Sequence, residues 1–120
     1  MPNSVRVEQL PVDFSDVSDR VLLDVREDDE WATGHVRGAL HIPLGDVPAR
    51  LDEIDPDAEL FVICHGGGRA ERAVRYLEQV GYEGANVEGG MIAWISAARE
   101  TVIDGDAAAG DNAGGEPDTA

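Results

Sequence analysis

The sequence predicts an α/β domain in which helices cover both faces of a mostly parallel sheet. Two observations predict this class. Residues 21–25 (VLLDV) and 60–64 (LFVIC) are short, continuous apolar runs rich in β-branched side chains, which is typical of buried parallel strands. An amphipathic helix over residues 69–80 follows the second run, and strands that alternate with helices favour a parallel sheet.

The segment between the two apolar runs predicts two short helices and one short strand. Residues 27–33 are acidic and form a helix that ends at Gly34. Residues 39–42 supply a brief strand. Residues 46–54 place apolar side chains on one helical face, with Pro48 near the start of the helix, where proline is tolerated.

The helix over residues 69–80 has the clearest period in the chain. Its apolar positions recur at helical spacing, and they are Ala70, Ala73, Val74, Leu77 and Val80. Gly81 is a natural terminator for this helix. Residues 85–87 then predict one more strand, a Gly-Gly pair predicts a turn, and residues 91–99 predict a final helix. The side chains that this last helix is expected to bury are Met91, Trp94, Ile95 and Ala98.

Acidic side chains dominate the composition. The 120 residues include 25 acidic and nine basic side chains, all nine of them Arg, which gives a formal net charge of −16. This balance argues against binding to nucleic acid or to anionic lipid, since both need clustered cations. The acidity fits either adaptation to a salt-rich cytoplasm or a bias of coding composition. No apolar run approaches the roughly 20 residues of a membrane span and no hydrophobic leader precedes the domain, so we expect a cytoplasmic protein.

The chain divides into one folded domain and a tail. Residues 1–103 carry all of the predicted strands and helices, and at this size they form one domain. Residues 104–120 contain five acids, four Gly and five Ala and no larger aliphatic or aromatic side chain. Such a segment buries too little surface to offset its ordering entropy, so we expect a disordered acidic tail.

The loop between the second apolar run and the long helix carries the reactive chemistry. It contains the only cysteine of the chain and reads Cys64, His65, Gly66, Gly67, Gly68, Arg69. Three successive glycines allow several backbone N–H groups to point at one centre, and the start of the following helix adds its positive dipole. A lone cysteine in an apolar strand is more often an inert hydrophobic side chain. The glycines and the Arg are poor for packing and good for anions, so they favour a thiolate or an anionic sulfur species at Cys64.

At these residues the chain resembles the rhodanese-like sulfurtransferases in their single-domain form. The active loop of that family runs from Cys through four residues to Arg, as Cys64 and Arg69 do. Further matches follow the family order across residues 3–100: Asp24-Val25-Arg26, Glu30-Trp31, Gly34-His35-Val36 with Gly38-Ala39, His41-Ile42-Pro43-Leu44, and Gly89-Gly90 with Ala93-Trp94.

The resemblance implies a five-stranded α/β domain and a thiosulfate-sulfurtransferase type of activity without a cofactor or metal. Cys64 would take a sulfane sulfur from thiosulfate or a persulfide donor and pass it to cyanide, a small thiol or a protein thiol. Loop residues 65–69 (His65, Gly66, Gly67, Gly68 and Arg69) would bind the donor, and Asp24 and Arg26 would support the loop. Two positions depart from the family: His65 stands where Arg is frequent, and Ala70 where Ser or Thr is frequent. An imidazole supplies positive charge only when protonated, so we expect weaker use of thiosulfate.

Three other interpretations of the same residues stay open. A cysteine phosphatase or arsenate reductase of related fold would need five residues between Cys and Arg, and this loop has four. A rhodanese-like binding module without turnover typically lacks the cysteine, which is present here. A metal site built from the histidines matches no common zinc spacing, so we expect none. Trp31 and Trp94 are interpreted as core residues.

Overall fold

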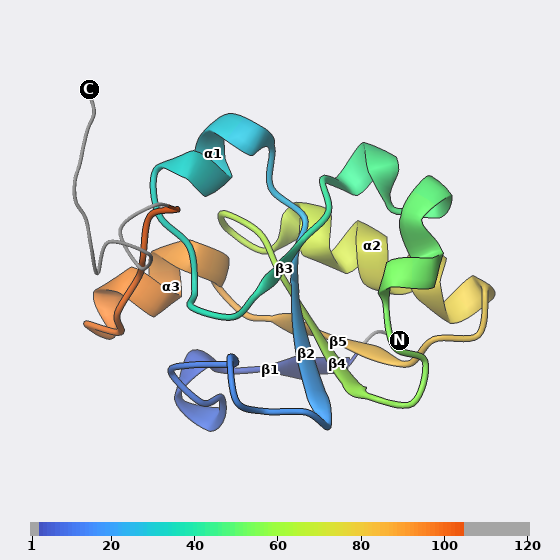
Figure 1. Ribbon diagram of the computed structural model, residues 1–120, viewed down its shortest axis with the longest axis horizontal. Coiled ribbons are helices and arrows are strands. Elements are labelled where there is room, and N and C mark those ends of the chain that lie inside the picture. The colour runs from blue at the N-terminus through green and yellow to red at the C-terminus, as the bar shows by residue number, and fades with distance from the viewer. Residues whose placement is uncertain (1–2, 105–120) are drawn as a thin grey trace.

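The computed structural model describes residues 3–104, and it has five parallel strands in one sheet with the order β1-β5-β4-β2-β3 (Figure 1). The strands are β1 Asn3–Val5, β2 Arg20–Asp24, β3 Leu40–His41, β4 Glu59–Ile63 and β5 Gly84–Val87. The two predicted apolar runs form β2 and β4, which lie side by side in the middle of the sheet. The predicted α/β class is therefore confirmed.

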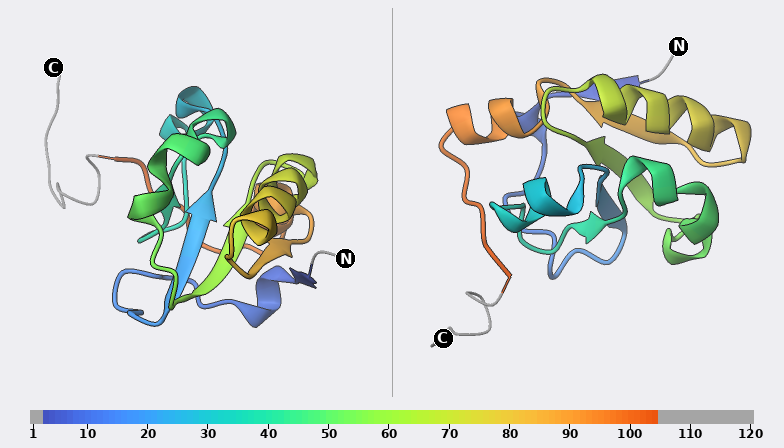
Figure 2. Two further views of the ribbon diagram at one scale, coloured as in Figure 1. Left: turned by 90° about the vertical axis from the view of Figure 1, so that its right-hand side faces the viewer. Right: turned by 90° about the horizontal axis from the view of Figure 1, so that it is seen from above.

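Helices and 3-10 turns cover both faces of this sheet (Figures 1 and 2). They are η1 Val7–Gln9, α1 Asp28–Ala32, η2 Leu44–Asp46, η3 Pro48–Glu53, α2 Gly68–Gln79 and α3 Gly90–Ser96. One core contains the apolar side of α2 and side chains of η2 and η3, packed on the even-numbered residues of β4. The second core contains η1 and α3 against the opposite side of β4. Helix α1 lies beyond the carboxyl end of β2.

Residues 46–54 do not form the single helix that their pattern predicts. Two short 3-10 helices take its place, and the second is kinked at Arg50, where φ is −123°. Pro48 has no N–H to donate, so the second 3-10 helix begins anew at this residue. Val47 and Ile54 are nevertheless buried against α2, as the amphipathic pattern predicts.

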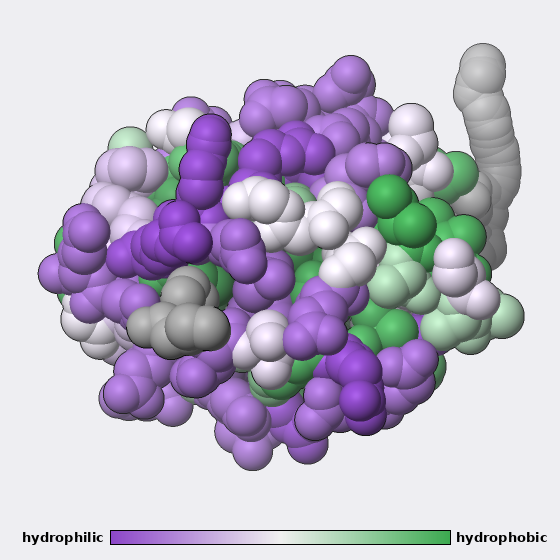
Figure 3. Space-filling view, turned by 180° about the vertical axis from the view of Figure 1, so that it is seen from behind, coloured by the Kyte–Doolittle hydropathy of each residue, from purple (hydrophilic) through white to green (hydrophobic). Residues whose placement is uncertain are grey.

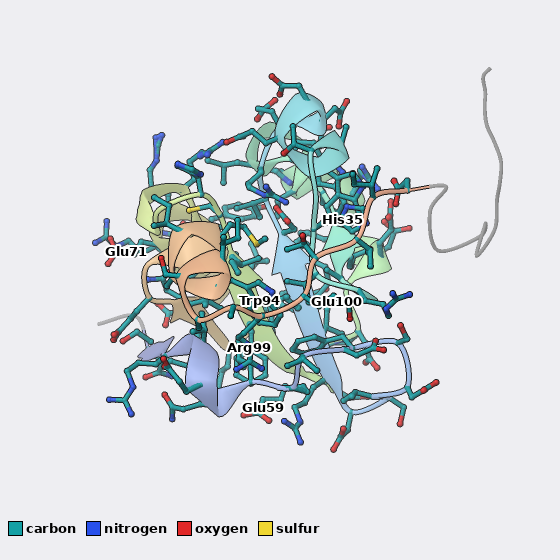
Figure 4. All side chains as sticks on the ribbon, turned by 90° about the vertical axis from the view of Figure 1, so that its left-hand side faces the viewer. His35, Glu59, Glu71, Trp94, Arg99 and Glu100 are labelled. Carbon is teal, nitrogen blue, oxygen red and sulfur yellow. The ribbon has the colours of Figure 1, made fainter. Side chains whose placement is uncertain are left out.

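The last helix ends earlier than predicted, at Ser96, because the chain reverses at Ala98, whose φ is +58°. The reversed segment returns beneath Trp94, whose indole N–H donates to the Glu100 carbonyl at 2.9 Å, while the Arg99 guanidinium lies over the indole ring (Figure 4). Trp94 is fully buried, as predicted.

Three aliphatic residues that were expected in the core are exposed. Ile95, in the last turn of α3, is 62% exposed, and Val80, the residue that follows α2, is 42% exposed. Ala98 lies beyond the end of α3 and is also exposed. Ile95 and the half-exposed Ile92 form part of an apolar surface over α3, visible at the right of Figure 3.

The final described residues pair with the loop that follows α1. His35 and Val102 exchange two backbone hydrogen bonds of 2.9 and 2.8 Å. The Asp104 carboxylate accepts the indole N–H of Trp31 at 2.9 Å and lies 3.0 Å from Nε2 of His35. Asp104, which we assigned to the tail, is thus in contact with the domain. Residues 105–120 lie outside the described residues, so the disordered tail stays a prediction.

Trp31 occupies a different environment from the core position expected for it. Its half-buried indole is stacked between two imidazoles, with ring centroids 3.5 Å from His35 and 4.5 Å from His41. This stack joins α1 to the loop that follows it and to β3. None of the helices in residues 3–104 has the length and hydropathy needed to cross a membrane.

Candidate active site

Cys64 follows β4 directly and lies at the carboxyl edge of the sheet, where ligands bind in parallel α/β domains. Its sulfur accepts the backbone N–H of Gly67 at 3.0 Å and that of Ala70 at 3.4 Å. Cys64 is only 1% exposed, yet it lines a pocket of about 460 Å³. The other lining residues are His65, Gly66, Gly68, Arg69 and Arg72. Cys64 is therefore placed at the pocket, with two backbone hydrogen-bond donors on its sulfur.

The inward direction of these donors depends on the backbone at Gly67. This residue precedes α2 and has a φ of +117°, which side chains with a Cβ rarely adopt. Of the two N–H groups on the sulfur, that of Gly67 belongs to the loop, and that of Ala70 to the first turn of α2. Gly67 is buried, whereas His65, Gly66 and Gly68 are exposed at the mouth.

Helix α3 supports the same loop from below. The N–H groups of Met91 and Ile92 donate to the carbonyls of Cys64 and His65 at 2.8 and 3.1 Å. These contacts require a close approach at Gly90, where a Cβ would lie 2.2 Å from the Cys64 carbonyl oxygen. The sequence indicated only a turn at the Gly-Gly pair. Gly90, the second glycine of that pair, indicates a close backbone contact at this position. The sequence does not identify the residues that make this contact.

Arg69 is engaged in an ion pair that the sequence did not indicate. Its two terminal nitrogens donate to the two carboxylate oxygens of Glu30 in α1, at 2.7 and 2.9 Å. The hydrogen bond from Arg69 is the main cause that lowers the pKa of Glu30 from 4.5 to about 2. Glu30 in turn raises the pKa of Arg69 further above its ordinary value. The pair ties α1 to the first turn of α2 and neutralises the charge of Arg69.

Asp24 and Arg26 form a buried bidentate pair at the end of β2. The guanidinium contacts the Asp24 carboxylate at 2.8 to 3.1 Å and also donates to the carbonyls of Glu30 in α1 and of Gly34, just beyond α1. Through α1 the pair also fixes Glu30 opposite Arg69, which supports the prediction that Asp24 and Arg26 hold the active loop, although indirectly.

The three histidines lie in different environments. His65 is exposed at the pocket mouth, whereas His41 donates its Nε2–H to the Arg26 carbonyl at 2.8 Å, and His35 is buried against Trp31. Within residues 3–104, no group of three or more His, Cys, Asp or Glu side chains is placed to hold a metal ion. The residues at the pocket suit an anion and a thiolate nucleophile.

The Glu30–Arg69 pair makes a testable contribution to stability. A carboxylate whose pKa is lowered by folding stabilises the folded state at pH values above its pKa in the unfolded chain. This contribution disappears as the pH falls from 4.5 through about 2. Glu30→Gln should therefore lower the free energy of unfolding by about 1 kcal/mol near neutral pH, and the difference from wild type should shrink toward pH 2. Urea unfolding at several pH values measures it.

Glu78→Gln is the matched control, since Glu78 is exposed on α2 and forms no ion pair with any of residues 3–104. Its stability should follow wild type at each pH. If the difference in the free energy of unfolding between Glu30→Gln and wild type stays constant down to pH 2, the charge of the Glu30 carboxylate does not contribute to stability.

Comparison with known proteins identifies one family and several relatives. A family profile described as "Rhodanese-like domain" matches residues 8–97. YtwF of Bacillus subtilis, provisionally named a sulfurtransferase, is 45% identical over 73 residues, which cover 61% of this chain and 71% of YtwF. A protein of Allochromatium vinosum named a sulfurtransferase is 37% identical over 95 residues, which cover 78% of this chain and 89% of that protein.

The fold is also that of solved structures. The crystal structure of a rhodanese-related protein from Thermoplasma volcanium superposes with a TM-score of 0.75 at 28% identity, over 85% of this chain and 99% of that chain. A rhodanese-like domain protein from Staphylococcus aureus gives a TM-score of 0.70 at 31% identity, over 86% of this chain and 94% of that chain. Both similarities extend over nearly all of the described residues.

Proposed function

The chain belongs to the rhodanese-like domain family, and from this membership we propose that it is a sulfurtransferase that carries a sulfane sulfur on Cys64. One observation carries the proposal: Cys64 lines a pocket, and its sulfur accepts the N–H groups of Gly67 and Ala70. Hydrogen-bond donors and a helix N-terminus beside the sulfur stabilise the negative charge that the transfer places there.

The first half of the reaction loads the enzyme. The Cys64 thiolate attacks the outer sulfur of thiosulfate, an S–S bond forms to Cys64, and the S–S bond of the donor breaks with its electron pair leaving on sulfite. The product is a Cys64 persulfide anion. The N–H groups of Gly67 and Ala70 support the sulfur as charge moves through it, and the pocket gives the added sulfur atom room.

The second half returns the enzyme to its starting state. An acceptor such as cyanide, a small thiolate or a protein thiolate attacks the outer sulfur of the persulfide, and the electron pair of the broken S–S bond returns to Cys64. The relatives named as sulfurtransferases and the Bacillus subtilis protein provisionally named a sulfur carrier support sulfur donors and acceptors as the general substrate class. The sulfur carrier is longer, since the match covers 40% of its length.

A phosphatase or arsenate reductase is disfavoured by the loop itself. Four residues separate Cys64 from Arg69, and the guanidinium that would face a tetrahedral phosphate instead holds Glu30. A binding module without turnover keeps the same fold and differs from an enzyme only in chemistry at Cys64. Measurement of the sulfur on Cys64 therefore separates the remaining classes.

The proposal is tested by loading the purified protein with thiosulfate and measuring its intact mass. We expect a gain of one sulfur atom, which is lost when cyanide is added, with thiocyanate as the product. A reductant such as dithiothreitol should also remove the added mass, because a persulfide is reducible. If no sulfur is gained from thiosulfate, mercaptopyruvate or a small persulfide, the proposed activity is wrong and a binding module is the better interpretation.

A further inference from the structure

We infer that Arg72, and not Arg69, is the residue that binds the anionic end of the sulfur donor and of the leaving group. The inference rests on the proposed sulfur transfer and names a specificity residue for it. Arg72 lies in the first turns of α2 and lines the same pocket as Cys64. It is exposed, so an anion reaches its guanidinium without any rearrangement of the domain.

The other permanent cation at the pocket is already neutralised. Both terminal nitrogens of Arg69 bind the two Glu30 oxygens, in the bidentate geometry that suits the planar guanidinium. A donor anion that displaced Glu30 would leave a carboxylate beside it, in a protein whose net charge is already −16. His65 at the mouth adds charge only when protonated.

Arg72 has no such partner within residues 3–104. No carboxylate there forms an ion pair with it, and no carbonyl accepts a hydrogen bond from its guanidinium. Arg75 is also exposed and free of ion pairs in the described part of the chain, but it does not line the pocket. The i, i+4 pair that Glu71 and Arg75 could form is not made in this structure. Arg72 and Arg75 therefore carry the same charge, and they differ in that only Arg72 lines the pocket.

Chemistry explains why the pocket needs this cation. Thiosulfate carries two negative charges and must approach a thiolate, and the sulfite that leaves also carries two. An unpaired guanidinium in the same pocket as the thiolate offsets this repulsion and stabilises the departing anion. A donor with a singly charged leaving group, such as benzenethiosulfonate, which releases benzenesulfinate, gains less from it.

The test compares wild type with Arg72→Gln, Arg72→Lys and the matched control Arg75→Gln. Two measurements are made: steady-state sulfur transfer from thiosulfate to cyanide, and calorimetric binding of sulfite, which needs no turnover. Arg72→Gln should raise the KM for thiosulfate about tenfold and weaken sulfite binding by a similar factor, since a charged hydrogen bond is lost. The effect on KM for benzenethiosulfonate should be smaller. Arg72→Lys should recover most of the loss, and Arg75→Gln should stay within about twofold of wild type.

The outcomes separate this inference from the proposed function. Equal effects of Arg72→Gln and Arg75→Gln on both measurements would overturn the role of Arg72, even in an active sulfurtransferase. If wild type transfers no sulfur but sulfite binding weakens only in Arg72→Gln, the anion site is supported and the proposed function is the part that fails.

Discussion

Cys64→Ser is expected to abolish sulfur transfer and the gain of one sulfur atom while the domain stays folded. Cys64 is the only cysteine of the chain, and the two methionine thioethers cannot form a persulfide. Serine is nearly isosteric, and its oxygen is able to accept the N–H groups of Gly67 and Ala70 that the sulfur accepts now. The stability should therefore change little, by about 1 kcal/mol or less.

The measurement is turnover with thiosulfate and cyanide beside wild type, with circular dichroism and thermal unfolding on the same samples. Cys64→Ala gives the second variant, because it removes the acceptor atom as well as the nucleophile and should be equally inactive. Turnover near the wild-type rate by a folded Cys64→Ser protein would end the proposed mechanism. A hydroxyl at this position is too weak a nucleophile to sustain it.

The parts of the fold that sequence alone predicted are those where one local pattern has one structural solution. The runs that became β2 and β4 are apolar on consecutive residues, as strands buried on both faces must be. The period in α2 placed Ala70, Ala73 and Leu77 correctly in the core. The short β1 was missed, because the three residues Asn3–Val5 carry no apolar run and are a strand only through their pairing with β5.

The candidate site was predictable where it is local and not where it depends on distant contacts. The loop from Cys64 to Arg69 is contiguous, so its glycines and cysteine indicate an anion cradle directly. The partner of Arg69 is Glu30 in another element, which no spacing rule identifies in a chain with 25 acidic residues. Arg72 also depends on distant contacts. The helical period of residues 69–80 places it on the outer face of α2, and only the fold shows that Arg72 borders the pocket.

The support of the loop by α3 is likewise a tertiary feature, and Gly90→Ala should disrupt it severely. A Cβ at position 90 would lie 2.2 Å from the Cys64 carbonyl oxygen and 2.6 Å from that of His65, at a φ of +56°. Both oxygens belong to the backbone and accept hydrogen bonds from N–H groups of α3, so neither can move without weakening these bonds. We expect a loss of about 2–4 kcal/mol in the free energy of unfolding, from left-handed strain and overpacking together. Because the same shift moves the Cys64 backbone, sulfur transfer should fall at least tenfold in the protein that remains folded.

Gly45→Ala is the matched control for this variant. Gly45 lies in η2, has no atom within 4 Å of an added Cβ, and does not have a positive φ. The same chemical change there should leave both stability and sulfur transfer close to wild type. Thermal unfolding and single-turnover sulfur loading at a temperature where both variants are folded measure the two effects separately. If Gly90→Ala matches Gly45→Ala in both, the loop tolerates a displaced α3, and the hydrogen bonds from Met91 and Ile92 do not position Cys64.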